Sequence, residues 1–315
     1  MGYDKALILP YKVCINNFQD VSRVYSFLNY HRHMCNADKI HGKAIHAIQI
    51  LQDDCMNILG KVKGFDQNPS FLIPYGNMPQ QITTQSAINI TVIPFIDLDC
   101  PVTWPVMAHE TVHAIGKYAG ARDSDNWMNE LKCDFAATIA LGPAYPLSYL
   151  LTYGLIPGRA KYLGESGPSH PYLENRLELC SEVLKKYLSY SDGFIDGWMK
   201  KAYEYVYRFE TEKTSAEHEK IMKKHAQELL DGFLPNTETE ENALLYGYSF
   251  EKFKKNKTAG VGKALLKGEN IKAKTPATIM NALVYETIRE NPDPANTKIL
   301  NAVIESLQKS KETEA

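Results

Sequence analysis

The chain has 315 residues, enough for one large or two modest domains with a buried core. Hydrophobic residues make up 44% and charged residues 23%, and 35 Lys and Arg against 37 Asp and Glu leave a formal net charge of −2. This balance excludes a wholly disordered chain. Without a basic excess it also argues against nucleic acid or an anionic membrane as the partner.

Cysteine usage and the N-terminal residues favour a cytoplasmic protein. The six cysteines are scattered, at positions 14, 35, 55, 100, 133 and 180 with no C-x-x-C pair, which is not the pattern of a disulfide framework or a zinc ribbon. The first residues lack the basic and long apolar regions of a secretory signal. The longest uncharged stretch, residues 135–158, is interrupted by proline, glycine and hydroxyl side chains, so we expect no integral membrane segment.

The first elements are predicted to be a helical segment and one strand. Apolar residues recur at helical spacing from residue 21 to about residue 62, where glycines end the pattern. A loop rich in Pro and Gln follows over residues 68–85. Residues 87–93 then alternate apolar with polar, which predicts a strand that Pro94 limits to an edge or an end of a sheet.

The rest of the chain is predicted to be helical. Helices are expected near residues 102–118, 125–141, 168–188, 197–230 and 299–307, with a further one beginning at Thr275 and Pro276. The polar tract 235–242 indicates a solvated connection, which divides the chain into residues 1–234 and residues 235–315. The expected fold class is therefore α+β, predominantly helical, with a small sheet.

The strongest chemical signal is an H-E-x-x-H motif on the helix predicted near residues 102–118. Its 3.6-residue pitch places His109 and His113 on one face, one turn apart, so that both imidazoles can reach a single metal ion. Zinc accepts such nitrogens and can leave a position for water. Glu110 lies beside the first histidine, where its carboxylate could take a proton from that water. The alternative is a pair of packing or surface histidines.

Two acids on the next predicted helix strengthen the metal hypothesis. Glu130 and Asp134 are four residues apart and share a helix face. A carboxylate from a neighbouring helix is a suitable third zinc ligand. If Glu130 binds zinc, Asp134 can accept the spare N–H of a ligating imidazole. Solvated acids are the alternative, which the apolar run after Asp134 disfavours.

The ordered motifs resemble those of gluzincin metallopeptidases, and in particular the HtpX and CAAX-prenyl-protease type of zinc endopeptidase. The resemblance rests on H-E-x-x-H, on the E-x-x-x-D pair Glu130 and Asp134, and on the segment S-H-P-x-x-x-x-R from Ser169 to Arg176. It covers roughly residues 100–180. It implies a zincin-like metallopeptidase core within residues 1–234. The helical patterns farther along the chain separately predict a C-terminal helical region over residues 235–315.

The resemblance also implies a role for each site residue. His109, His113 and Glu130 would bind Zn²⁺, and Glu110 would be the general base. His170 and Arg176 would lie near the site, where a cationic or imidazole donor could stabilise an oxyanion, a contribution of about 3 kcal/mol per donor. Arg176 could instead orient an acidic ligand, and the His170 segment could simply be the loop that starts a helix.

Two departures keep other functions open. Members of that family usually have transmembrane helices, and Cys133 stands where they usually have a small Ala; this thiol is a buried inert residue or an additional metal ligand. The segment from Glu130 to Pro143 also resembles ImmA/IrrE-type regulatory metalloproteases. A zincin-type sensor with little turnover and a purely structural metal are the remaining alternatives.

The sequence therefore predicts a zinc-dependent peptidase whose partner is a peptide or protein substrate. The strand predicted at residues 87–93 precedes the zinc helix, where an extended peptide could add to a sheet edge. Residues 252–274 hold eight Lys and one Glu, which predicts a solvated face or, less simply, a contact with an acidic partner.

Overall fold

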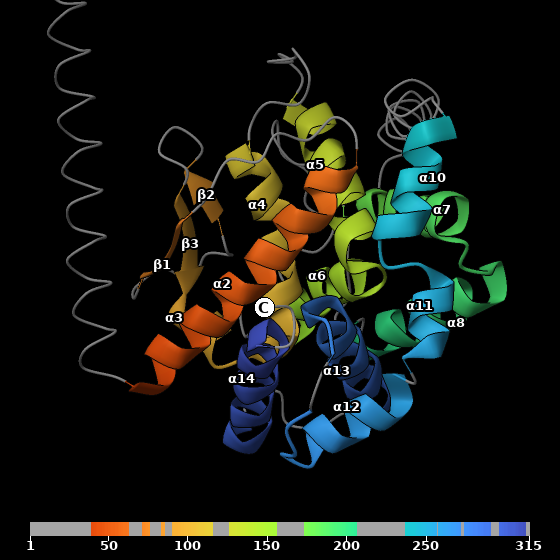
Figure 1. The fold of residues 1–315 in the computed structure, drawn as a ribbon. Coiled ribbons are helices and arrows are strands. Elements are labelled where there is room, and N and C mark those ends of the chain that lie inside the picture. The colour runs from red at the N-terminus through yellow and green to blue at the C-terminus, as the bar shows by residue number, and fades with distance from the viewer. Residues whose placement is uncertain are drawn as a thin grey trace, which may run out of the picture.

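The structure, a computed structural model of the chain, describes ten segments. They are residues 39–62, 71–75, 83–85, 90–115, 126–155, 173–206, 237–256, 258–271, 274–290 and 296–312. The elements follow in the order α2 (Lys39–Lys61), β1 (Phe71–Tyr75), β2 (Thr83–Gln85), β3 (Ile90–Pro94), α3 (Phe95–Leu98), η1 (Pro101–Val106), α4 (Met107–Ile115), α5 (Asn126–Leu141), α6 (Ala144–Leu155), α7 (Leu173–Leu188), α8 (Asp192–Val206), α10 (Thr237–Tyr246), α11 (Phe250–Lys255), α12 (Thr258–Leu266), α13 (Pro276–Glu290) and α14 (Thr297–Glu312). Figure 1 shows their arrangement.

Helix α2 is the long amphipathic helix that the first apolar stripe predicts. It crosses the front of the molecule in Figure 1 and packs against α4, α5, α13 and α14. Its inner face repeats at intervals of three and four residues and is fully buried at Ala44, Ile48, Leu51, Cys55 and Leu59. The part of this prediction that falls on residues 21–38 lies outside the described residues.

Helix α5 is the centre of the molecule, and α2, α4, α6 and α7 all pack against it. From Glu130 to Leu141 each of its residues is buried. That stretch includes four polar side chains, Glu130, Lys132, Asp134 and Thr138. Charged groups are buried in proteins only when they are paired or bind a metal. The buried charged side chains in the middle of α5 therefore mark a candidate functional site.

The three strands are short and form one small sheet in the order β1-β3-β2. β3 runs parallel to β1, with Ile73 opposite Val92, and antiparallel to β2, with Thr84 opposite Thr91. The strand predicted at residues 87–93 is observed as β3, Ile90–Pro94, and it ends at the predicted proline. It lies in the middle of the sheet, so the expectation that it offers a free edge is wrong.

The expected α+β fold class is also wrong, and the fold is all-helical in class. Helices make up nearly all of the described residues, and the strands are only five, three and five residues long. Such strands cannot form a layer that covers a core of this size, so helix packs on helix instead. The alternating pattern of residues 87–93 does predict a strand, but this strand belongs to a small sheet in a molecule made mostly of helices.

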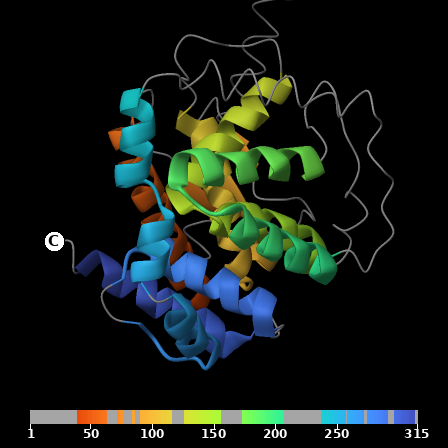
Figure 2. The same ribbon diagram turned by 90° about the vertical axis from the view of Figure 1, so that its right-hand side faces the viewer.

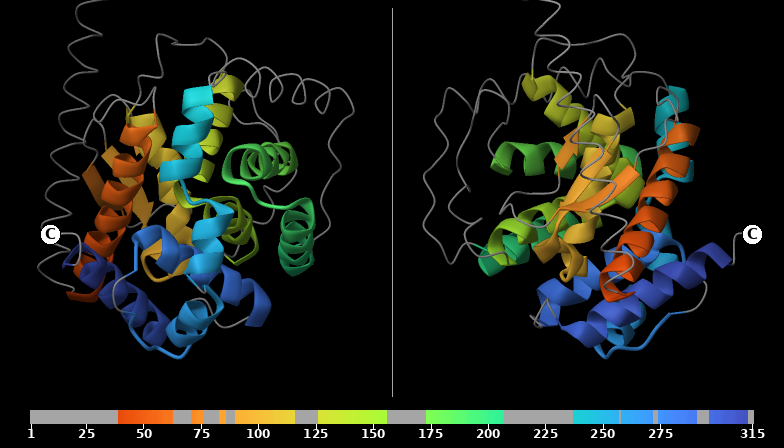
Figure 3. Two further views of the ribbon diagram at one scale, coloured as in Figure 1. Left: turned by 45° about the vertical axis from the view of Figure 1, so that its right-hand side comes forward. Right: turned by 90° about the vertical axis from the view of Figure 1, so that its left-hand side faces the viewer.

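The C-terminal helices pack directly against the N-terminal ones. α13 contacts α2, α6 and η1, and α14 contacts α2. The lower part of Figures 2 and 3 shows α12, α13 and α14 together, at the opposite end of the molecule from α4 and α5. α13 begins at Pro276 with the amide of Thr278 donating to Oγ1 of Thr275, which confirms the predicted start of this helix. The boundary predicted between residues 234 and 235 lies outside the described residues and stays a prediction. The solvated connection predicted at residues 235–242 is wrong for residues 237–242, which belong to helix α10.

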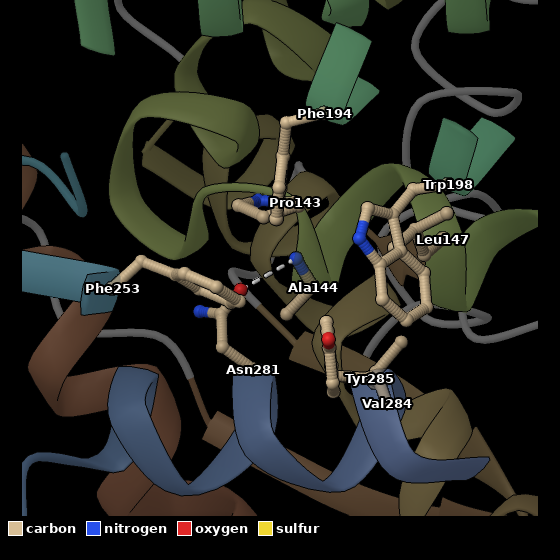
Figure 4. Close-up of a pocket in the computed structure, with 9 residues that line it drawn as sticks. All are labelled: Pro143, Ala144, Leu147, Phe194, Trp198, Phe253, Asn281, Val284 and Tyr285. Atoms are coloured by element: carbon tan, nitrogen blue, oxygen red, sulfur yellow. Dashed lines mark hydrogen bonds between the residues drawn. The ribbon is translucent and has the colours of Figure 1, made fainter. Parts of the chain in front are cut away.

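Asn281 on α13 fixes the corner between α5 and α6. α5 ends at Leu141 and is followed by Gly142, whose φ of +56° is a left-handed conformation that suits glycine. The amide of Ala144 donates to Oδ1 of Asn281 at 3.0 Å, and Nδ2 of Asn281 donates to the carbonyl of Leu141 at 2.7 Å. Figure 4 shows this amide beside a small apolar pocket, with the rings of Phe194, Trp198, Phe253 and Tyr285 around it. The C-terminal region thus holds the two helices whose side chains meet at the site below.

Part of the lysine-rich stretch 252–274 has a structural role. Nζ of Lys252 lies 2.7, 3.0 and 2.8 Å from the carbonyl oxygens of Leu245, Tyr246 and Gly247, the last carbonyls of α10 and the turn after it. A cation at a helix C-terminus satisfies these acceptors and the helix dipole. None of the helices in the described segments is long and apolar enough to cross a membrane.

Replacing Glu286 by Gln is expected to stabilise the protein. The Glu286 carboxylate is buried and makes no hydrogen bond within the described segments, although Arg289 lies 2.9 Å from one oxygen. Burial raises the pKa of Glu286 in the folded protein. The protonated carboxyl therefore contributes its full stability at a pH below the pKa of the unfolded chain, and this contribution is lost as the pH rises through the folded pKa. At neutral pH, Glu286→Gln should add about 1 kcal/mol to the free energy of unfolding.

Thermal unfolding at several pH values tests this expectation. The gain should shrink as the pH falls toward about 4, the usual pKa of Glu. Glu241→Gln, at an exposed position, is the matched control and should change nothing. A lower melting temperature for Glu286→Gln at neutral pH would contradict the assignment.

Candidate metal centre

Helix α4 presents both histidines of the H-E-x-x-H motif on one side. It follows directly from the buried 3₁₀ turn η1, and Met107, Ala108 and Val112 are fully buried on its other side. The His109 side chain is 4% exposed and the His113 side chain 26%. Nε2 of His109 and Nε2 of His113 lie 3.0 Å apart. The two imidazoles therefore converge on one point, which remains accessible on the His113 side.

Glu130 on α5 completes a set of three converging side chains that could bind a metal. Its Oε2 lies 3.2 Å from Nε2 of His109 and its Oε1 lies 3.2 Å from Nε2 of His113. Ligands at about 2.0–2.1 Å around a tetrahedral zinc ion lie roughly 3.3 Å from one another. The separations between the three side chains are close to that value, so the donor set and its spacing fit a metal ion.

The charges of the site hold its groups in the forms that pair with each other. Burial disfavours a charged His109, but the hydrogen bonds that its ring donates to Asp134 and Glu130 outweigh this effect and raise the pKa of His109 to about 9. Burial likewise opposes an ionised Glu130, yet the two histidines and Arg176 keep its pKa far below the usual range. A proton on His109 can thus occupy the place of a cation, and metal binding must displace it.

Asp134 lies behind His109, on the side away from Glu130. Its Oδ1 is 2.9 Å from Nδ1 of His109, the contact that fixes the tautomer of a metal-binding histidine. Nε and Nη2 of Arg176 each donate to this carboxylate at 2.7 Å, and both side chains are buried. Although burial favours the neutral acid, the Arg176 charge lowers the pKa of Asp134, which stays ionised.

Two tyrosines of α6 belong to the same network and were not predicted. The hydroxyl of Tyr145 donates to Asp134 and lies 3.2 Å from Nδ1 of His109, and Nη1 of Arg176 donates to the hydroxyl of Tyr149 at 2.5 Å. Arg176 also stacks over the ring of Tyr149, 4.5 Å from its centroid. The spacing of the two tyrosines, four residues apart beyond Gly142 and Pro143, is the sequence signal that could have identified them.

Cys133 contacts Nδ1 of His113, the ring nitrogen other than the one that lies 3.0 Å from Nε2 of His109. Its Sγ lies 3.4 Å from Nδ1 of His113. His109, His113 and Cys133 together form a group that could hold a metal ion. Burial, with the carboxylates of Glu130, Asp134 and Glu110, raises the pKa of the Cys133 thiol. Among the described residues the possible ligands are therefore two imidazoles with Glu130, with Cys133, or with both.

The remaining predicted site residues are Glu110, Arg176 and His170, and the structure describes the first two. Glu110 is half-buried on α4, and its charge acts on Cys133, which places it at the rim of the site. Arg176 is buried, and its nitrogens contact Asp134, Tyr149 and, at 3.4 Å, Glu130. These contacts suit a structural counter-charge better than a donor to an oxyanion. His170 lies outside the described residues.

Comparisons with protein-family models, with curated proteins and with solved structures find no match to this chain. The geometry of the cluster and the chemistry of its side chains are therefore the basis for the function proposed below.

A metal ion bound at this cluster is expected to raise the thermal stability of the protein. A ligand that binds only the folded state stabilises it, by about 4 kcal/mol when its free concentration is about a thousand times its Kd. Differential scanning fluorimetry with added Zn²⁺ and with a chelator measures this shift. Because the ion must displace the proton of His109, the stabilisation should weaken as the pH falls below about 9.

The variant Glu130→Gln removes the charge of one proposed ligand, and its melting temperature should lose most of the response to zinc. Equal melting temperatures for the unsubstituted protein with zinc and with chelator would contradict a metal site.

Proposed function

We propose that this protein is a zinc-dependent peptidase of the gluzincin type that its motifs resemble. The observation that carries the proposal is the convergence of Nε2 of His109, Nε2 of His113 and the Glu130 carboxylate within 3.2 Å of one another. Two imidazoles and a carboxylate are the ligand set of a catalytic rather than a structural zinc ion, since they leave the fourth position for water.

The surroundings of the ligands support zinc. Asp134 contacts the Nδ1 side of His109, as the outer carboxylate does in carboxylate–histidine–zinc arrangements. Arg176 balances the second negative charge, so the buried site carries two carboxylates against one guanidinium and one cation. Nitrogen and oxygen donors at these spacings suit Zn²⁺ better than the six or more oxygens that Ca²⁺ requires.

The proposed reaction is hydrolysis of a peptide bond with Glu110 as the general base. When bound, zinc supplies a water of lowered pKa and polarises the substrate carbonyl. Glu110, one residue from His109 and only partly buried, can accept the proton of that water and then deliver it to the departing amine. His109 stays fixed by Asp134, and Arg176 keeps Asp134 ionised throughout.

The small sheet suggests how an extended substrate would be bound. β3 has a neighbour on both sides, so β1 and β2 are the outer strands. β2 also packs against α4, the helix that bears both histidines. A peptide pairing with the outer edge of β2 would lie beside the site, through backbone hydrogen bonds that are largely independent of sequence.

An unbiased peptide-library digest tests the proposal. The zinc-loaded full chain should cleave a subset of peptides, and chelation should stop the cleavage. Glu110→Gln, with zinc content measured on the same sample, separates loss of the base from loss of the metal. Zinc-loaded protein that leaves every peptide intact would refute the peptidase function.

A structural metal site is a second candidate, which the position of Cys133 favours. With Cys133 as a fourth protein ligand beside His109, His113 and Glu130, no position would remain for water. The two candidates differ in whether the sulfur of Cys133 contacts the ion.

A further inference from the structure

Three side chains of α5 that contact the two histidines lie on the same face of the helix. Glu130, Cys133 and Asp134 are spaced i, i+3 and i+4, so one helix face carries them all. Glu130 contacts both Nε2 atoms. Asp134 contacts Nδ1 of His109 at 2.9 Å, and Cys133 contacts Nδ1 of His113 at 3.4 Å. Each imidazole therefore has Glu130 on one ring nitrogen and a second α5 side chain on the other.

The contact to His113 decides which atom of the ring can face the ion. The two ring nitrogens point away from each other, and the one that binds a metal is set by the hydrogen bond that the other makes. A sulfur 3.4 Å from Nδ1 lies within the range of an N–H to sulfur hydrogen bond. With Nδ1–H as the donor in this bond, Nε2 of His113, which lies 3.0 Å from Nε2 of His109, would carry the lone pair that can bind the ion.

We propose that Cys133 is a positioning residue for His113, which accepts a hydrogen bond from Nδ1–H and so holds Nε2 toward the metal, and that it is not itself a ligand. This inference rests on the proposed zinc site. Cys133 does for His113 what Asp134 does for His109, with a neutral and weaker acceptor. The two histidines therefore have unequal outer partners. His113, whose side chain is 26% exposed, is the more weakly held ligand.

Cobalt substitution of the full chain tests the proposal directly. A cobalt–thiolate bond gives a strong near-ultraviolet charge-transfer band, which nitrogen and oxygen ligands do not give. We expect the Co²⁺-loaded unsubstituted protein to show visible d–d bands without the thiolate band. A thiolate band that disappears in Cys133→Ser would overturn the positioning role while leaving the metal site in place.

Zinc affinity in two variants provides the second readout. Cys133→Ala removes the acceptor and should weaken zinc binding about 10-fold, the lower end of the effect of losing an outer partner of a metal ligand. Cys133→Ser keeps a hydrogen-bonding atom and should restore most of that affinity. Cys55→Ala, a fully buried thiol on α2, is the matched control and should bind zinc as the unsubstituted protein does.

The remaining outcomes also discriminate. Cys133→Ala that folds and binds zinc as tightly as the unsubstituted protein would overturn the inference alone. An unsubstituted protein that binds neither Co²⁺ nor Zn²⁺ would overturn the proposed function, and the inference with it.

Discussion

Glu110→Gln is expected to lower the rate of peptide hydrolysis by roughly 10²–10⁴-fold, the usual contribution of a positioned general base. Gln has nearly the shape of Glu but cannot accept the proton of the attacking water. The proposed ligands His109, His113 and Glu130 are untouched, so zinc content should not change. The measurement is kcat/KM on a peptide found by the library digest, with zinc quantified on the same sample.

The matched control is Glu178→Gln, at an exposed position of α7, which should keep full activity and full zinc. Undiminished hydrolysis by Glu110→Gln would remove Glu110 as the base. Loss of zinc together with activity would show that Glu110 acts in metal binding instead.

Asp134→Asn is expected to cost about 3–5 kcal/mol of stability, the penalty for breaking a buried ion pair on one side. Asp134 is fully buried and accepts two hydrogen bonds from the buried Arg176, so its loss leaves a guanidinium without its counter-charge. It also removes the charged partner of His109 Nδ1. Zinc affinity should therefore fall about 10–100-fold as well.

Chemical denaturation and zinc competition measure the two effects separately. Asp192→Asn breaks an ion pair with Lys185 at a side chain that is 78% exposed, and should cost less than about 1 kcal/mol. The double variant Asp134→Asn with Arg176→Met removes both charges and should regain part of the lost stability. A cost for Asp134→Asn as small as that for Asp192→Asn would contradict a buried charge network.

Helical periodicity was enough to find the elements that carry the site. The helix predicted near residues 125–141 is observed at Asn126–Leu141, and α4 lies within the range predicted near residues 102–118. Spacing of three and four residues fixes which side chains share a face, so the pairs His109 with His113 and Glu130 with Asp134 follow from sequence alone. That the two helices meet at these faces is a tertiary fact that only the structure shows.

What the sequence did not reveal has two physical causes. The fold class was wrong because local alternation predicts a strand but not how much of the core the strand will cover, and a few short strands do not change an all-helical fold. Tyr145 and Tyr149 were missed because α6 has no charged residues and contains an internal proline, Pro146, so it lacks the amphipathic pattern that identifies a surface helix.

The role of Arg176 could also be assigned only from the contacts that its side chain makes in the structure. A motif places an arginine near a metal site but does not show what its nitrogens contact. In the structure they contact Asp134, Tyr149 and Glu130, and this makes Arg176 a counter-charge for the ligand network.

Anomalous X-ray diffraction at the zinc edge, on crystals of the zinc-loaded chain, tests the central claim most directly. The account predicts one strong peak about 2.0–2.2 Å from Nε2 of His109, Nε2 of His113 and a carboxylate oxygen of Glu130, with solvent in the fourth position. A peak whose fourth ligand is the sulfur of Cys133, or one placed away from these three side chains, would contradict it.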